Sequence, residues 1–168
     1  MENTNTEHKK NLPKEINLAI VTISDSRKIE NDSSGKLIKE FINKEGYNII
    51  SYSIIPDKKE TIKNKLLKLI SENIDVIITT GGTGLTSRDV TIETIKPLFE
   101  KEINAFSTLF QKLSFEAIGS ASFLSRATAG IIKKKLIFCL PGSPNAVRLA
   151  MKKLIIPEIA HIIKHIRE

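Results

Sequence analysis

The fold of this chain is decided by residues 74–89, which read Ile74-Asp75-Val76-Ile77-Ile78-Thr79-Thr80-Gly81-Gly82-Thr83-Gly84-Leu85-Thr86-Ser87-Arg88-Asp89. The apolar, β-branched residues at the start of this stretch are typical of a buried strand. The glycines that follow let the backbone turn tightly and bring its N–H groups close to phosphate oxygens. An acid beside such a loop can hold a divalent cation that bridges to a phosphate. The stretch therefore predicts a strand–loop–helix site for a phosphate-bearing substrate with Mg²⁺.

The rest of the composition fits one ordinary domain. The chain has 168 residues, 40% of them hydrophobic and 27% charged, which is typical of a globular protein with a proper core. A single cysteine, Cys139, excludes a disulfide within the chain and suits a cytoplasmic protein. No apolar run approaches the roughly 18 residues of a membrane helix. We expect residues 1–15, which lack a signal-peptide pattern, to be a mobile tail, and residues 16–168 to form a single domain.

The net charge of +7 has several possible explanations. The lysines are scattered, and only seven Phe and two Tyr are available for base stacking, which argues against a dedicated nucleic-acid surface. Electrostatic attraction of a polyphosphate substrate is the simpler interpretation. We therefore expect an anionic small molecule as ligand and no nucleic-acid or membrane partner.

Hydrophobic periodicity predicts alternating strands and helices. Strands are expected over 16–24, 47–55 and 74–80, with amphipathic helices through 37–42 and 62–70 between them. Further along, we expect short helices from 91 and from Pro97, a helix over 102–115, a hairpin of 127–132 with 136–140, and helices from about 146 and from Pro157. This order predicts an α/β fold with three αβα layers around a mostly parallel sheet.

Several predicted strands end in a polar or glycine-rich loop. These loops are Ser24-Asp25-Ser26, Pro56-Asp57, Gly81 to Gly84, and Pro141-Gly142-Ser143. Ligands bind beyond the carboxyl ends of strands in open α/β sheets, so the four loops are expected to converge on one cleft. Common nucleotide fingerprints are absent, because Ser87 stands where G-x-G-x-x-G needs its last glycine and no Walker A lysine follows Gly81.

Structural roles compete with these functional ones. The glycine run alone also fits a plain tight turn. Asp89 could instead be the N-cap of the helix starting at Thr91, and Asp57 could be a plain turn or cap residue. Asp25 could cap or stabilise its own loop. His161 and His165 have the spacing of a metal chelate but no third ligand nearby, which favours a solvated helix end. Cys139 is expected in the core, and Lys133 to Lys135 in a solvated turn.

Two motifs together resemble the signatures of the molybdopterin adenylyltransferase family, of the MogA/MoaB type. The first is Thr80-Gly81-Gly82-Thr83-Gly84 with Arg88-Asp89-Val90-Thr91, and the second is Pro141-Gly142-Ser143-Pro144-Asn145-Ala146-Val147. The segments 102–106, 113–115 and 124–127 are similar to the MoaB branch. The resemblance spans about residues 16–163.

The resemblance implies the fold of the molybdopterin-binding domain and a Mg²⁺-dependent adenylylation of molybdopterin by ATP, in molybdenum or tungsten cofactor synthesis. It implies that Asp57 and Asp89 are the catalytic acids and hold Mg²⁺ with the ATP phosphates. The implied substrate-binding residues are Asp25, Ser26, Thr80, Gly81, Gly82, Thr83, Gly84, Arg88, Gly142, Ser143, Pro144 and Asn145.

The family pattern also implies a homotrimer or a hexamer made as a dimer of trimers, and hand-over of the product to the metal-insertion enzyme. Two departures are visible: Ile92 stands where Pro is common, and Lys58 follows Asp57 where a second acid is common. Because of the second departure, we expect Asp89 to contribute more than Asp57 to binding the cation. The alternative interpretation is a non-catalytic molybdopterin carrier of the same pathway. The metal-insertion step itself is disfavoured, because it normally resides in a much longer chain.

Overall fold

The computed structural model describes residues 12–168, and a sheet of six strands in the order β2-β1-β3-β6-β5-β4 runs through this part of the chain. The parallel strands are β1 (Asn17–Ile23), β2 (Asn48–Ile55), β3 (Val76–Thr80) and β6 (Lys135–Leu140). Antiparallel strands β5 (Thr128–Ile132) and β4 (Lys101–Glu102) complete one edge. The predicted mostly parallel sheet is confirmed, whereas the short β4 lies where the sequence predicted the start of a helix.

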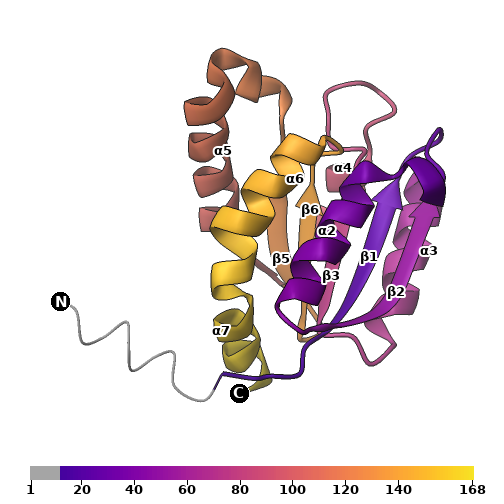
Figure 1. The fold of residues 1–168 in the computed structure, drawn as a ribbon. Helices are drawn as coiled ribbons and strands as arrows, with labels where there is room; N and C mark the ends of the chain where they lie inside the picture. Colours follow the sequence, from indigo (N-terminus) through magenta and orange to yellow (C-terminus); the bar gives the residue numbers. More distant parts are fainter. Residues whose placement is uncertain (1–11) are drawn as a thin grey trace.

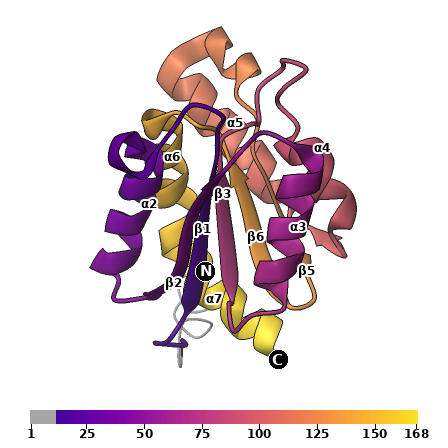
Figure 2. The same cartoon turned by 90° about the vertical axis from the view of Figure 1, so that its right-hand side faces the viewer.

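Helices cover both faces of the sheet (Figures 1 and 2). On one face lie α2 (Ser33–Lys44), α5 (Asn104–Ile118), α6 (Pro144–Ala150) and α7 (Ile156–Arg167), and on the other α3 (Lys59–Ile70) and α4 (Thr91–Ile95). A π-helical segment, Met151–Ile155, joins α6 to α7, and 3-10 turns occupy Ile29–Asn31, Lys96–Leu98 and Gly119–Leu124. The three-layer αβα architecture is therefore confirmed. Within residues 12–168, no helix combines the length and the apolar character needed to cross a membrane.

Strand β3 occupies the middle of the sheet because its side chains suit burial on both faces. It pairs with β1 on one side and β6 on the other, and all five of its residues are buried. Val76 and Ile78 belong to the core beneath α2, α5, α6 and α7, and Ile77 belongs to the core beneath α3 and α4. Full burial of such a side chain contributes about 1.5–3 kcal/mol. This double anchorage fixes where the glycine loop emerges.

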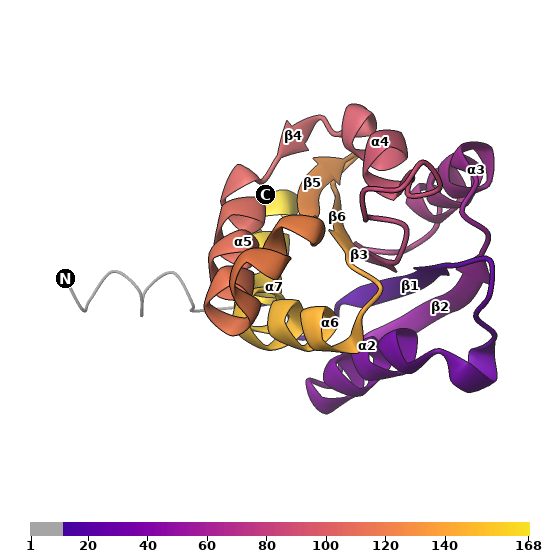
Figure 3. The same ribbon diagram turned by 90° about the horizontal axis from the view of Figure 1, so that it is seen from above.

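The connections diverge beyond β1 and β3. After β1 the chain crosses through α2 to β2 at the edge, and after β3 it continues to the opposite half of the sheet. In open α/β sheets, the carboxyl ends of the strands at such a divergence form the ligand-binding crevice. Figure 3 looks onto this edge of the molecule.

Local signals explain most element boundaries. Gly46, with φ of +76°, follows α2 as predicted, and the β5–β6 hairpin turns through Lys133 and Lys134, with φ of 45° and 60°. Two consecutive positive φ values are typical of the tight hairpin turn that matches strand twist. Most of the predicted mobile tail lies outside the described residues. Within residues 12–15, the Glu15 carbonyl accepts a hydrogen bond from Arg167.

Candidate functional site

The turn after β3 requires glycine at two positions. Gly81 has φ of +104°, and a Cβ there would collide with the carbonyl oxygen of Ile23. Gly82 has φ of +62°, and a Cβ there would collide with Asp57 Oδ1 and Thr91 Oγ1. L-residues are strained at positive φ, so these are both backbone and packing requirements. The loop is thus pressed against the ends of β1 and β2, and more than a plain turn is needed to explain its glycines.

All four carbonyl oxygens of the Gly81–Gly84 loop are engaged by neighbouring donors. The first two accept hydrogen bonds from the hydroxyl and the N–H of Thr91, each of 2.9 Å. The last two accept from Arg126, whose Nε lies 2.9 Å from the Thr83 oxygen and whose Nη2 lies 2.6 Å from the Gly84 oxygen. Because the carbonyl dipoles are paired within the protein, the loop does not oppose a phosphate with unpaired oxygens.

Arg126 is a site residue that the sequence interpretation missed. Besides its two contacts with the loop, it forms an ion pair of 2.6 Å with Glu93 in the first turn of α4. In the sequence, the segment 124–127 that contains Arg126 shows only a similarity to the MoaB branch. A signal was present, because the predicted hairpin of 127–132 with 136–140 places residue 126 beside residue 141, at the carboxyl end of β6. Arg126 therefore connects the antiparallel half of the sheet to the glycine loop.

Two of the four predicted loops, Ser24-Asp25-Ser26 and Pro56-Asp57, meet at one cavity of about 310 Å³, where they face the segment that follows the Gly81–Gly84 loop. Its lining residues come from the ends of β1, β2 and β3, and they are Ser24, Asp25, Ser26, Asp57, Thr86, Arg88 and Asp89. The Gly81–Gly84 and Pro141-Gly142-Ser143 loops do not line this cavity but pack against each other: a Cβ on Gly142 would stand 3.4 Å from the Cα of Gly81. The arrangement places three carboxylates and one guanidinium next to the glycine loop.

Asp57 has a buried carboxylate oxygen that no hydrogen-bond donor reaches. Its Oδ1 is buried and has no hydrogen-bond partner, while its N–H donates to Asp25 Oδ1 at 3.1 Å. Burial raises the pKa of Asp57, and the negative charges of Asp25 and Asp89 raise this pKa further. Asp57 does not cap α3, because Lys58 occupies the N-cap position. A buried carboxylate oxygen without a donor is suited to a cation.

Asp89 is held by its own turn. Its Oδ2 accepts hydrogen bonds from the N–H of Thr86 at 2.9 Å and from the Thr86 hydroxyl at 2.6 Å. The hydroxyl contact is the main reason that the pKa of Asp89 is lowered. The predicted alternative, an N-cap of the following helix, does not apply, because Val90 is the N-cap residue of α4. Asp89 is thus a fixed anion facing the cavity.

The acids fit Mg²⁺ that is shared with a substrate. Within residues 12–168, no three His, Cys, Asp or Glu side chains are close enough to hold a metal ion by themselves. Mg²⁺ ordinarily uses one or two carboxylates and completes its shell with substrate phosphates and water. Because Asp57 Oδ1 has no hydrogen-bond partner, Asp57 fits such a cation at least as well as Asp89, whereas the sequence interpretation placed the cation more on Asp89.

The remaining predicted residues divide into scaffold and surface. The buried Thr80 hydroxyl donates to the Pro141 carbonyl at 2.8 Å, so this side chain holds the two loops together. Ser143 caps α6, accepting a hydrogen bond of 3.2 Å from the Ala146 N–H. Pro144 begins that helix, and Asn145 is exposed on its first turn.

The cysteine and the histidine pair, the other candidates from the sequence, lie outside the cavity and have neighbours that explain them without a functional role. Cys139 is fully buried in β6, and burial raises the pKa of its thiol to about 12, as the predicted core position implies. His161 and His165 contact each other through their Nε2 atoms at 2.9 Å, and each is also near a glutamate of α7 or of the C-terminus. Both histidines belong to α7, which runs to the end of the molecule opposite the carboxyl edge of the sheet (Figure 1).

The unpaired acid predicts a stability change. Asp57→Asn should raise the melting temperature at pH 7, because a raised folded-state pKa means that ionisation destabilises the folded protein. This penalty grows as the pH rises above the unfolded-state value near 4 and is absent below it, so the gain should vanish at about pH 3. About 1 kcal/mol corresponds to roughly 2–4 °C for a chain of this size, and we expect a shift of that order. Thermal unfolding at both pH values measures this shift.

The charge-matched control is Glu40→Gln, at an exposed position on α2. An unchanged or lower melting temperature for Asp57→Asn at pH 7 would contradict the prediction.

The fold and the cavity define a three-layer α/β protein with a glycine loop and adjacent acids at the carboxyl edge of its sheet. The model of the family described as "probable molybdopterin binding domain" matches residues 19–161. The Bacillus cereus protein named molybdenum cofactor biosynthesis protein B is 51% identical over 159 residues, covering 94% of this chain and 94% of that protein. The chain belongs to the molybdopterin-binding domain family, of the MogA/MoaB type, and is closest to its MoaB branch.

Solved structures agree with this assignment. A crystal structure of molybdenum cofactor biosynthesis protein B superposes with a TM-score of 0.89 at 48% identity, over 92% of this chain and 98% of that chain. The Pyrococcus furiosus tungsten cofactor synthesizing protein MoaB superposes with a TM-score of 0.85 at 43% identity, over 93% of this chain and 99% of that chain. The predicted fold family is therefore confirmed.

Proposed function

We propose that the protein acts in molybdenum or tungsten cofactor biosynthesis, in the cytoplasm, as a molybdopterin adenylyltransferase. In this reaction, an oxygen of the terminal phosphate of molybdopterin attacks the α-phosphorus of ATP. The bond between that phosphorus and the oxygen leading to the β-phosphate breaks, and pyrophosphate leaves. The proposal rests on Asp57, which lines a cavity with Asp25 and Asp89 and whose Oδ1 is buried against Gly82 of the glycine loop without a hydrogen-bond partner.

The residues suggest a division of labour between the two substrates. We assign the Gly81–Gly84 loop to the phosphate that attacks, because its carbonyls are engaged elsewhere. Asp57 and Asp89 are assigned to the ATP phosphates, together with Mg²⁺, which when bound would neutralise their negative charge. Arg88 lines the same cavity and adds a positive charge there. Transfer of this kind depends mainly on alignment and electrostatics, so no protein nucleophile is required.

Pyrophosphate release tests the proposal. We expect the protein to release pyrophosphate only when molybdopterin, ATP and Mg²⁺ are all present. Omission of molybdopterin controls for simple ATP hydrolysis. Binding of molybdopterin without pyrophosphate release would contradict the proposed adenylyltransferase activity. It would support a carrier that hands molybdopterin to the metal-insertion enzyme.

We also propose that the protein assembles as a homotrimer or a dimer of trimers through an apolar face on α5 and the turn after it. Phe123 and Leu124 are 71% and 66% exposed, and Phe115 and Ile118 are each 56% exposed. A groove of about 960 Å³ lies along the same helix. Contiguous exposed apolar side chains are typical of an interaction surface. The family pattern implies that a second copy of the chain covers this face.

Phe123→Ser should therefore weaken assembly. Light scattering after size-exclusion chromatography should give a trimer or hexamer for the wild type and a smaller mass for the variant at low micromolar concentration. Leu67→Ser is the control, because Leu67 is 47% exposed but lies on α3, across the sheet. A monomeric wild type, or an equal effect of both substitutions, would contradict the assignment.

A further inference from the structure

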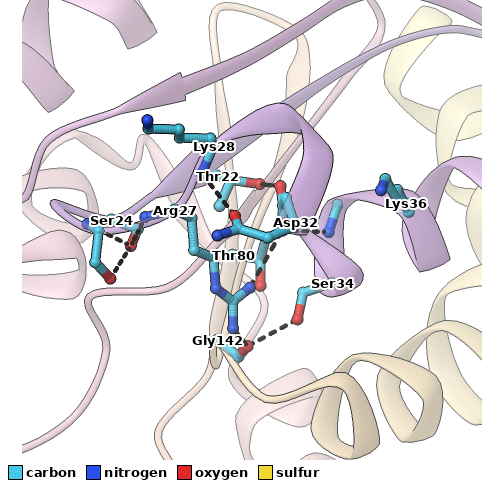
Figure 4. Close-up of polar contacts among 12 residues, drawn as sticks. Thr22, Ser24, Arg27, Lys28, Asp32, Ser34, Lys36, Thr80 and Gly142 are labelled. Carbon is cyan, nitrogen blue, oxygen red and sulfur yellow. Dashed lines mark hydrogen bonds and ion pairs between the residues drawn. The ribbon is translucent and has the colours of Figure 1, made fainter.

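A buried carboxylate outside the cavity anchors a network that reaches the second signature loop (Figure 4). Asp32 is fully buried and accepts hydrogen bonds from the Thr22 hydroxyl, the Tyr52 hydroxyl at 2.7 Å, the Gly35 N–H at 3.0 Å and Arg27 Nη1 at 3.1 Å. Burial alone would raise the pKa of Asp32, but the four donors together lower it. Asp32 is therefore an anion that holds the Arg27 guanidinium in place.

Arg27 continues from this anchor to the loop after β6. Its Nη2 donates to the Gly142 carbonyl at 2.8 Å, and the Ser34 hydroxyl donates to the same oxygen at 2.7 Å. Figure 4 shows the guanidinium between Asp32 and Gly142. Two side chains from the segment after β1 thus fix one carbonyl of a loop more than 100 residues away in sequence.

Capping of α2 does not account for this network. Asp32 is the N-cap of α2, and the bond from Gly35 serves that purpose. The cap needs neither Arg27 nor any contact with Gly142. A planar guanidinium donates in two fixed directions, which a lysine ammonium on a flexible stem reproduces poorly. The residue type at position 27 therefore matches a strut between Asp32 and the Gly142 carbonyl.

The position of Gly142 affects the glycine loop directly. A Cβ at Gly142 would stand 3.4 Å from the Cα of Gly81, so the two backbones are nearly in contact. Gly81 also donates its N–H to the Leu140 carbonyl at 3.0 Å. A shift of the Pro141–Gly142–Ser143 loop would therefore change the wall against which the glycine loop is built.

We propose that Arg27 is a positioning residue for the molybdopterin side of the site: anchored by Asp32, it holds the Pro141–Gly142–Ser143 loop against Gly81. This inference rests on the proposed adenylyl transfer. Arg27 acts through the Gly142 carbonyl rather than on the reacting atoms, so its loss should weaken binding of one substrate more than it slows the chemical step.

Steady-state kinetics of Arg27→Gln test this assignment. The KM for molybdopterin should rise about 10-fold or more, while the KM for ATP and kcat should change less than about 3-fold. Arg27→Lys keeps the charge but loses the fork, and Ser34→Ala removes the other donor to Gly142, so each should give a smaller rise. Arg167→Gln is the control, because Arg167 pairs with Asp75 at the amino end of β3 and should leave all three constants unchanged.

A second measurement separates this inference from the proposed reaction. Amide hydrogen exchange at Val147, whose N–H donates to the Ser143 carbonyl at 3.0 Å, should be about 10-fold faster in Arg27→Gln than in the wild type without substrates, with exchange in α3 unchanged. If the wild type released no pyrophosphate, the adenylyl transfer would fail while faster exchange still supported the strut. If Arg27→Gln does not fold, Arg27→Lys and Ser34→Ala carry the same comparison. An active wild type with an unchanged KM for molybdopterin in these variants, or equal rises in both KM values, would overturn the proposal.

Discussion

Asp89→Asn is expected to reduce adenylyl transfer at least about 100-fold while molybdopterin binding changes less than about 3-fold. The substitution removes the negative charge from the cavity but keeps a side-chain oxygen that can accept the hydrogen bonds of Thr86, so the turn should survive. The loss should appear in kcat, because the carboxylate is assigned to the ATP phosphates. Pyrophosphate release measures turnover, and titration calorimetry measures molybdopterin binding.

The matched control for this result is Thr86→Ala. It removes one of the two hydrogen bonds to Asp89 and leaves the charge in place. A small effect of Thr86→Ala beside a large effect of Asp89→Asn would assign the loss to the charge. Full activity of Asp89→Asn would show that Asp89 only closes its own turn.

Gly81→Ala should have the largest effect on stability, a loss of about 3 kcal/mol or more in the free energy of unfolding. The left-handed φ of +104° costs about 1–2 kcal/mol for an L-residue, and the collision with the Ile23 carbonyl adds an overpacking cost of about 1–3 kcal/mol. The Ile23 carbonyl belongs to the backbone of β1 and cannot rotate away as a side chain can. Urea unfolding provides the measurement.

Gly46→Ala separates the two contributions. Gly46 also has a positive φ, +76°, but a Cβ there would have no heavy atom within 4 Å. We expect it to lose only about 1 kcal/mol, the backbone cost alone. Similar losses for the two substitutions would mean that the close packing of Gly81 against β1 contributes nothing.

The fold was predictable where local patterns and packing agree. The run from Ile74 to Thr80 is apolar and β-branched, and it lies at the centre of the sheet with both faces covered. The glycines after it predicted a tight loop at a strand end, and two of them have positive φ. The short β4 was missed because Lys101 and Glu102 are exposed and polar, and their pairing with β5 depends on the tertiary structure.

The candidate site was less predictable, because its geometry depends on contacts between distant segments. Asp57 was found from its place after a strand, but its buried, unpartnered oxygen required the position of Gly82. No local pattern shows what Arg126 and Arg27 contact. Their partners, the carbonyls of Thr83, Gly84 and Gly142, lie 42 to 115 residues away in the chain.

The site concentrates features that are unfavourable for folding alone. Asp57 carries a buried oxygen without a donor, and the neighbouring Gly81 and Gly82 adopt positive φ angles that only glycine accepts without strain. Elsewhere the described chain forms well-packed cores on both faces of the sheet. Local conflicts of this kind are typical of functional sites, where stability is lost in exchange for binding or catalysis. The expected stabilisation by Asp57→Asn, combined with lost turnover, would be the signature of such an exchange.

Transfer of label from ATP tests the proposed reaction most directly. Wild-type protein is incubated with molybdopterin, Mg²⁺ and ATP labelled at the α-phosphate. The pterin product is then separated, identified by mass spectrometry and assayed for the label. The proposal predicts label in adenylyl-molybdopterin in equal amount to the pyrophosphate released. Molybdopterin that stays unlabelled while remaining bound to the protein, or label recovered only in free nucleotide, would contradict it.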